Sequence, residues 1–99
     1  MPRRWVLRWT GLALSDLRSI RLYVAQDKPA VAKALAERIR RSVLRLREYP
    51  ESGRVVPELE AQGYREVLVP PYRIIYVVRA HEIFILRVWH GRRDLTEGE

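Results

Sequence analysis

Cysteine is absent from this sequence, and histidine occurs only twice among its 99 residues. Without cysteine the chain can form no disulfide bond, no thiolate metal site and no thiol nucleophile, a composition that fits a reducing compartment. The two histidines have no cluster of carboxylates at ligand spacing beside them, and no glycine-rich loop is spaced to hold a phosphate. We therefore expect no metal ion and no cofactor.

Long apolar runs are also missing. Arg8 and Asp16 interrupt the N-terminal segment before its apolar part reaches the ~7–15 residues of a secretory signal. No window approaches the ~20 apolar residues that a membrane span needs. Hydrophobic residues still make up 47% of the chain, which favours a folded globule over disorder. We expect one cytoplasmic domain over residues 1–99, without a membrane segment and with a frayed tail at 94–99.

Lysine is scarce, although the chain is strongly basic. It carries 19 basic and 12 acidic residues for a net charge of +7, and only Lys28 and Lys33 are not arginine. Arginine grips a carboxylate or a phosphate with a planar, permanently charged fork. The net charge is therefore consistent with a nucleic-acid or ribosomal surface, or with an acidic protein partner. Codon bias in a GC-rich genome would explain the ratio of arginine to lysine but not the net charge.

Two amphipathic helices are predicted in the first half of the chain. Apolar residues recur at helical spacing from Ala13 to Val24, which predicts a first helix over about residues 12–25. Pro29 suits the first turn of a second helix, whose apolar positions keep the helical period as far as Leu46. Because only about three residues join the two helices, they should fold back as an antiparallel hairpin.

The remaining segments are typical of strands. Residues 4–9 predict a first strand, and residues 52–63 predict a loop with one short extended piece. A tight turn at Ala80-His81 should join the last two strands into a hairpin. The last three predicted strands cover residues 64–69, 72–79 and 82–90. The order β-α-α-β-β-β predicts an α+β fold, in which a helical hairpin packs on an antiparallel β-sheet.

The last two strands are apolar on both faces, whereas a sheet with one wet face should alternate. In residues 82–90 we expect one face to carry Phe84, Leu86 and Val88 and the other to carry Ile83, Ile85, Arg87 and Trp89. The helical hairpin can cover only one face. The second face should therefore meet a partner chain, a second copy, or the chain's own loop at 52–63.

Seven short segments, in this order and spacing, carry a resemblance to a known family. They are Leu12–Leu17 with Ile20 and Tyr23, Pro29 with Ala32, Leu46 with Pro50, Gly53–Pro57, Arg65–Val67, Tyr72–Tyr76 and Ile83–Leu95. Together they resemble the RelE/ParE toxins of bacterial type II toxin–antitoxin pairs, the ParE branch in particular. The resemblance covers almost the whole chain and implies a helical hairpin on an antiparallel sheet, with a cognate antitoxin as partner.

The resemblance leaves two mechanisms open. RelE-like toxins cut messenger RNA in the decoding site of the ribosome with basic residues on the sheet and a C-terminal tyrosine, whereas ParE-like toxins poison DNA gyrase. Arg73 and Arg92 match two RelE-type arginines. Tyr64 and Glu66 stand where many RelE-type enzymes have lysines, and residues 97–99 lack the tyrosine. This pattern favours a gyrase-directed toxin that is not an enzyme.

Basic and aromatic residues of the last strands are the candidate site. In a RelE-like enzyme the catalytic residues would be Arg73, Arg92 and His90. Alternatively, Arg73 only pairs with an acid such as Glu66 or Glu82. An inactive, toxin-like binding module is a third interpretation. As residues that bind the target or partner we expect Arg65, Arg73, Ile83, Ile85, Trp89, His90, Arg92 and Arg93.

Overall fold

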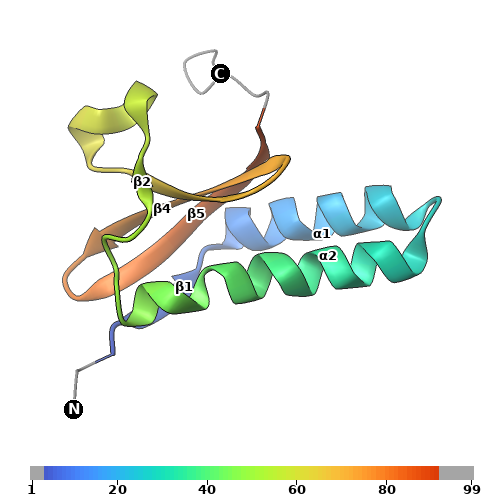
Figure 1. Ribbon diagram of the computed structural model, residues 1–99, viewed down its shortest axis with the longest axis horizontal. Helices are drawn as coiled ribbons and strands as arrows, with labels where there is room; N and C mark the ends of the chain where they lie inside the picture. The colour runs from blue at the N-terminus through green and yellow to red at the C-terminus, as the bar shows by residue number, and fades with distance from the viewer. Residues whose placement is uncertain (1–3, 92–99) are drawn as a thin grey trace.

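The computed structural model of the protein describes residues 4–91. It consists of two layers, a five-stranded sheet and a pair of antiparallel helices against one face of that sheet (Figure 1), which confirms the predicted α+β class. The elements are β1 (Val6–Trp9), α1 (Gly11–Ala25), α2 (Pro29–Ser42), the 3-10 helix η1 (Leu44–Arg47), β2 (Arg54–Val55), the 3-10 helix η2 (Pro57–Gln62), β3 (Arg65–Val69), β4 (Tyr72–Arg79) and β5 (Glu82–His90).

Helix α1 begins at Gly11, one residue before the predicted start, and Thr10 caps it. The Thr10 hydroxyl accepts a hydrogen bond from the Ala13 amide at 3.2 Å, which satisfies one of the unpaired donors of the first turn. The same hydroxyl donates to the Ile85 carbonyl at 2.8 Å and so ties the helix start to the sheet. Ala13 and Leu17 are buried against the sheet, as the amphipathic pattern predicts.

Helix α2 starts at Pro29 as predicted but ends earlier than its apolar period. The α-helix stops at Ser42, whose hydroxyl donates to the Ile39 carbonyl at 2.6 Å, and the chain tightens into η1. Leu46 nevertheless remains fully buried. The apolar period of the sequence thus predicted the burial of Leu46 correctly but not the end of the α-helix. A 3-10 turn over a few residues keeps the apolar side chains directed toward the core, so the period continues beyond the α-helix.

The sheet order is β1-β5-β4-β3-β2. The predicted antiparallel arrangement is confirmed for β2 to β5, whereas β1 runs parallel to β5 in the register Val6–Glu82 to Trp9–Ile85. No hairpin turn sets the direction of β1, since two helices and three strands separate it from β5. The β4–β5 hairpin turns at Ala80-His81 as predicted, and both residues have positive φ, 51° and 64°.

A β-bulge at Leu86 reverses the predicted faces of β5 beyond that residue. Tyr76 pairs with Ile85 and Ile75 with Arg87, so that Leu86 has no partner in β4. The extra residue shifts the alternation of side chains by one position. Ile83, Ile85 and Val88 therefore all enter the core under the helical hairpin, and the expected grouping of Val88 with Phe84 and Leu86 was wrong.

The segment that contains β2 and η2 lies on the side of the sheet opposite the helices (Figure 1). On that outer face Ile75 and Val77 of β4 are buried, as is Val56 between β2 and η2. Of the three covers expected for the second face, the chain's own loop at 52–63 therefore supplies at least part. Partly buried Phe84 and Leu86 retain some exposure.

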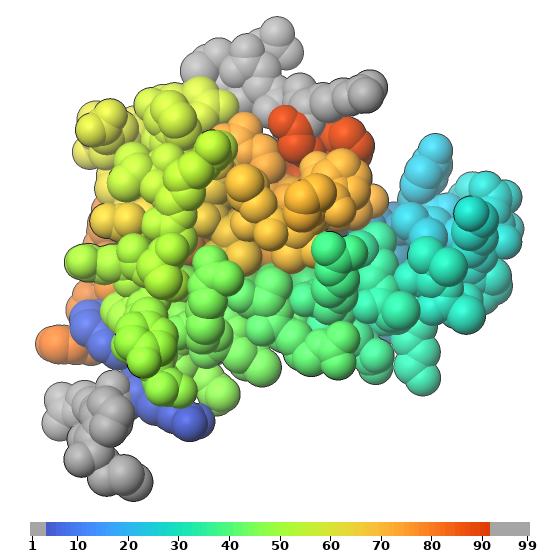
Figure 2. Space-filling model, viewed as in Figure 1, coloured from blue at the N-terminus to red at the C-terminus, as the bar shows by residue number. Residues whose placement is uncertain are grey.

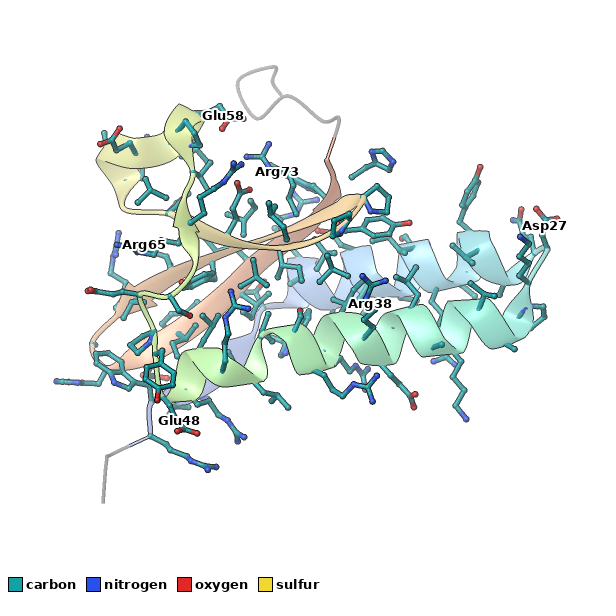
Figure 3. The ribbon with its side chains drawn as sticks, in the orientation of Figure 1. Asp27, Arg38, Glu48, Glu58, Arg65 and Arg73 are labelled. Atoms are coloured by element: carbon teal, nitrogen blue, oxygen red, sulfur yellow. The ribbon has the colours of Figure 1, made fainter. Side chains whose placement is uncertain are left out.

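The helical hairpin is longer than the sheet beneath it. Its turn, which holds Asp27, extends beyond the strands (Figures 2 and 3). Large apolar residues near this end, Leu22, Tyr23 and Val31, are exposed. Within residues 4–91 neither helix is long and apolar enough to cross a membrane, and no group of histidines or carboxylates there could hold a metal ion.

Candidate functional site

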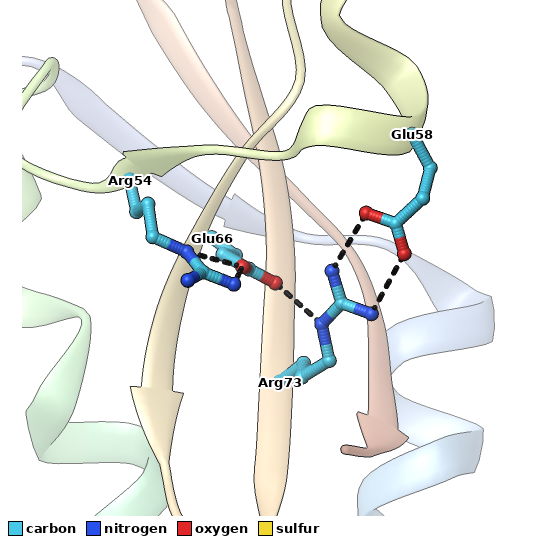
Figure 4. Close-up of polar contacts among 4 residues, drawn as sticks. All are labelled: Arg54, Glu58, Glu66 and Arg73. Atoms are coloured by element: carbon cyan, nitrogen blue, oxygen red, sulfur yellow. Dashed lines mark hydrogen bonds and ion pairs between the residues drawn. The ribbon is translucent and has the colours of Figure 1, made fainter. Parts of the chain in front are cut away.

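Four charged side chains form a chain of ion pairs on the outer face of the sheet (Figure 4). Arg54 comes from β2, Glu66 from β3, Arg73 from β4 and Glu58 from η2. The Arg54 guanidinium donates twice to one carboxylate oxygen of Glu66, through Nε at 2.8 Å and through Nη2. The Arg73 Nε donates to the other oxygen of Glu66 at 2.6 Å. We call this group the outer-face ion network.

Arg73 is held on two sides by carboxylates. Besides Glu66, it contacts Glu58 end-on, with Nη1 to Oε2 at 3.2 Å and Nη2 to Oε1 at 3.3 Å. Its residue exposure is only 8%. The Glu58 carboxylate and then that of Glu66 raise the pKa of the Arg73 guanidinium above its usual value, against the opposing effect of burial. The expected alternative of an ion pair with Glu66 is therefore confirmed, while Glu82 pairs with Arg8 instead.

Glu66 is the most deeply buried member of the network. Its side chain has no exposed area, and both of its oxygens accept hydrogen bonds from arginines. A buried carboxylate without a partner would cost several kcal/mol, and its two arginine partners offset that desolvation. The contacts join β2, β3 and β4 across the outer face. Their geometry thus gives Glu66 a role in holding the β2–η2 segment on the sheet.

Beside the network lies a cleft of about 380 Å³. Its charged lining consists of Arg54, Arg73 and Glu58, and apolar side chains complete it. The two arginines and two glutamates of the network cancel in charge. A phosphate could reach the fork of Arg73 only by displacing Glu58, so the cleft in this conformation is not built to hold an anion. Its apolar and small lining residues are Pro57, Leu68, Pro70, Pro71, Tyr72 and Gly91.

Three of the expected target- or partner-binding residues serve the fold instead. The Arg65 Nη1 donates to the carbonyls of Glu51 at 3.1 Å and Gly53 at 2.8 Å, which fixes the chain before β2. Ile83 and Ile85 are fully buried in the core, so their expected role at a binding surface is corrected. The reason is that the helical hairpin covers the face of β5 that carries these two side chains, and the apolar pattern on both faces did not reveal which face the helices would cover.

The end of β5 carries the other expected residues. Trp89 is partly buried, with the Arg87 guanidinium 4.9 Å from its ring centroid. His90 is exposed and meets Tyr72 edge-on, with the ring centroids 5.8 Å apart. The structure thus brings Trp89 and His90 to one end of the sheet, with Tyr72 beside His90. Arg92 and Arg93 lie outside the described residues.

An ion pair between α1 and β5 escaped the sequence analysis. Asp16 accepts from Arg87 through both of its oxygens, at 2.8 Å and 3.0 Å, and also from the Val88 amide at 2.9 Å. Strand β1 ends opposite Ile85, so this carboxylate pairs an amide of β5 that lies beyond the end of the neighbouring strand. Asp16 also raises the pKa of the Arg87 guanidinium. No sequence signal links residues so far apart, and Glu58 was missed for the same reason.

Two relatives of this chain are named as a toxin and a putative toxin. A protein of Caulobacter vibrioides named "Toxin RelE2" is 42% identical over 86 residues, which cover 86% of this chain and 93% of that protein. A "Putative toxin Y4kP" of Sinorhizobium fredii is 35% identical over 90 residues, covering 89% of this chain and 90% of the relative.

Solved structures agree on the fold. The chromosomal ParDE toxin–antitoxin system of P. aeruginosa contains a chain that superposes with a TM-score of 0.76 at 26% identity, covering 89% of this chain and 97% of that one. The RelBE2 toxin–antitoxin complex of Mycobacterium tuberculosis matches with a TM-score of 0.59 at 23% identity, covering 88% and 91%. The family model described as the ParE toxin of the type II toxin–antitoxin system parDE matches residues 7–95. The chain therefore belongs to the ParE toxin family, within the RelE/ParE superfamily that its sequence resembles.

Proposed function

We propose that this chain is a cytoplasmic toxin that a cognate antitoxin neutralises and that acts by binding DNA gyrase, not by cutting RNA. Membership of the ParE family and the likeness to a ParDE system support the antitoxin partner and the gyrase target. The antitoxin would cover part of the toxin surface until it is degraded.

The observation that carries the choice of mechanism is the state of Arg73. Cleavage of RNA needs basic groups that are free to hold phosphate and to stabilise charge in the transition state. Here three donors of the Arg73 guanidinium point at the carboxylates of Glu66 and Glu58, and the side chain is nearly buried. Glu66 also stands where many RelE-type enzymes have a lysine, so this position supplies no positive charge for an RNA backbone. Both features support binding over catalysis.

Within this proposal the end of β5 is the contact region. Trp89 and His90 lie there, and Arg92 and Arg93 follow directly in the sequence. Aromatic rings and arginines are the residues that dominate many protein interfaces. Arg65 and Arg73 would contribute indirectly, by fixing the outer-face segment, and Ile83 and Ile85 by filling the core.

A ribosome-dependent endoribonuclease is the alternative. It is favoured by the name of the Caulobacter relative, "Toxin RelE2", which shares 42% of its aligned residues with this chain. It would require Glu58 to leave Arg73, so that Arg73 could act together with His90 and Arg92.

Two assays with the purified chain separate these functions. We expect it to inhibit DNA supercoiling by purified gyrase, and to leave messenger RNA intact in a ribosomal translation mixture. In a bacterial host, induced expression should then stop growth with a DNA damage response. Messages cut in the ribosomal A site, with cleavage lost in Arg73→Lys, would overturn the gyrase proposal. Harmless expression without antitoxin would indicate an inactive binding module.

A further inference from the structure

Helix α1 presents to solvent a face that carries no charge. The exposed residues on this face are Gly11, Leu12, Ser15, Ser19, Leu22 and Tyr23. The three charged residues of α1 point elsewhere. Asp16 pairs with Arg87 of β5. Arg18 and Arg21 line the hollow between α1 and α2. We call the uncharged surface the α1 outer face.

Such a face is unexpected in a chain of which 31% of the residues are charged. The exposed side of α2 follows the ordinary pattern, with Lys33, Glu37, Arg38 and Arg41. On the α1 outer face, by contrast, Leu12 is 61% exposed, Leu22 62% and Tyr23 75%. The hydroxyls of Ser15 and Ser19 form no side-chain hydrogen bond within residues 4–91. The face therefore has apolar surface and free hydroxyls to offer a partner.

The spacing along the α1 outer face is that of a seam between two helices. Steps of three, four and three residues separate Leu12, Ser15, Ser19 and Leu22. Their order is the same when it is read in either direction. A two-fold axis between Ser15 and Ser19 would therefore place Leu12 of one copy opposite Leu22 of another, with the two α1 helices antiparallel. The serines would meet at the centre, where small side chains let the helices approach closely.

The ends of this seam fit each other as well. Tyr23 and Gly11 both lie six positions from the midpoint of the stripe, so the ring of one copy would lie over the glycine of the other. Gly11 has no side chain, and a Cβ built there would meet nothing within 4 Å. The large exposed ring would thus find open space opposite it.

Charge favours a second copy as the occupant of this face. Each copy carries a net charge of +7, so two copies can meet closely only where like charges are absent. An acidic protein or a nucleic acid would find no arginine on the face to pair with. Arg18 borders the face and would approach its counterpart across the axis, so salt should favour the contact by screening this repulsion.

We propose that the α1 outer face binds a second copy of this chain, through antiparallel α1 helices whose two-fold axis passes between Ser15 and Ser19. None of its residues belongs to the outer-face ion network, to the adjacent cleft or to the end of β5. The proposal therefore does not depend on the target of the toxin. The 15 residues of α1 span about 22 Å, so the contact is short and the dimer should dissociate on dilution.

Sedimentation equilibrium of the purified chain over a range of concentrations measures this association. We expect a dimer whose dissociation constant falls as salt rises. Leu12→Lys and Leu22→Lys combined should raise the dissociation constant by at least about tenfold, since the contact would bury four like charges. The matched control combines Val31→Lys and Leu44→Lys, which add the same charge at exposed apolar positions outside α1. We expect the control to stay within about threefold of the parent chain.

Cross-linking tests the antiparallel register, because the chain has no cysteine of its own. We expect a mixture of Ser15→Cys and Ser19→Cys chains to form a disulfide-linked dimer on mild oxidation, and to do so faster than either variant alone. A mixture of Glu37→Cys and Arg41→Cys chains is the control. These two positions have the same spacing on the exposed side of α2, and their linkage should not exceed background.

A chain that stays monomeric at every concentration would overturn the proposal and leave the α1 outer face to a different protein. Equal weakening in the two lysine variants would also overturn it, since net charge alone would then explain the loss. Faster linkage within one cysteine variant than in the mixture would contradict the antiparallel arrangement. Thermal melting checks that each variant folds. If the α1 lysine variant does not, Leu12→Gln with Leu22→Gln takes its place.

Discussion

At the scale of single residues, the buried carboxylate of Glu66 joins three strands. It accepts from Arg54 and Arg73, and its side chain has no exposed area. We predict that Glu66→Ala lowers the free energy of unfolding by about 3–5 kcal/mol, because two arginines lose their shared partner and one of them is buried. Urea denaturation followed by circular dichroism measures the loss. Glu60→Ala, at an exposed position of η2, is the control and should change stability by less than about 0.5 kcal/mol.

Replacing the two buried members of the network together tests whether their ion pair itself adds stability. If Glu66→Leu and Arg73→Met are combined, the buried charges disappear together, and the loss should be clearly smaller than for Glu66→Ala alone. A double variant as unstable as the sum of its single changes would contradict this account.

Tyr76 is a second buried polar residue, and it predicts a pH dependence. Its hydroxyl donates to the Pro50 carbonyl at 2.8 Å and accepts from the Gly53 amide at 2.9 Å. Burial raises the pKa of the Tyr76 phenol above its ordinary value near 10, against the smaller opposing effect of the Gly53 amide. The native state therefore binds this proton more tightly than the unfolded state. Its contribution is complete below about pH 10 and is lost as the pH rises through the higher native pKa.

Thermal melting between pH 8 and pH 11, roughly the range around the tyrosine pKa, checks this prediction. Tyr76→Phe should flatten the decline above about pH 10, although it costs on the order of 1–2 kcal/mol at neutral pH through its lost hydrogen bonds. Tyr23→Phe controls for removal of a phenol, since Tyr23 is 75% exposed. An unchanged decline in Tyr76→Phe would assign the effect to other groups.

At the scale of elements, the β4–β5 turn is strained by its own residues. Ala80 has a φ of 51°, a conformation that a Cβ disfavours and that glycine or asparagine adopts more readily. We predict that Ala80→Gly raises the free energy of unfolding by about 0.5–1 kcal/mol. Ala34→Gly, on the exposed side of α2, should lower it by about 1 kcal/mol. Chemical denaturation of the two variants measures the change in the free energy of unfolding for each. A lower free energy of unfolding in Ala80→Gly would show that the turn needs the methyl group of Ala80.

The elements also show how far the sequence alone could lead. The helices, the hairpin turn and the short extended piece in the loop were predictable because local period, proline and turn chemistry determine them. The end of α2 was not, since Ser42 diverts its hydroxyl to the backbone while burial continues to Leu46. The bulge at Leu86 was also unpredictable, because it depends on the register of a neighbouring strand.

The candidate site was predictable only in part. Arg73 stood out from its family position, and Glu66 was among its expected partners. Glu58 and Asp16 were missed, because each reaches its arginine from another element, and contacts of that kind depend on the folded arrangement. Ile83 and Ile85 were misplaced because β5 is apolar on both faces, so that its sequence does not show which face the helices cover.

At the scale of the whole molecule, the first strand, β1, pairs with the last strand, β5. The Thr10 hydroxyl and the Ile85 carbonyl that meet at this junction are 75 positions apart. Closing so long a loop is costly before any contact compensates for it, so the contacts of β1 should form late in folding. We predict that Leu7→Ala, which removes a partly buried side chain on β1, speeds unfolding and leaves the folding rate nearly unchanged.

Stopped-flow measurements in urea give both rates. The expected φ-value for Leu7→Ala is below about 0.3. Ile39→Val, in α2 of the locally connected hairpin, is the comparison and should give a higher value. A φ-value near 1 at Leu7 would mean that β1 and β5 dock before the hairpin is complete.

The pairing of β1 with β5 has a consequence for the cell that makes this toxin. Translation at roughly 5–20 residues per second separates the synthesis of the two strands by about 4–15 seconds. Until β5 has left the ribosome, β1 has no neighbouring strand and the core lacks Ile83, Ile85 and Val88. A nascent or truncated chain therefore cannot present the finished surface. Any surface that depends on the complete sheet forms only after β5 has been released.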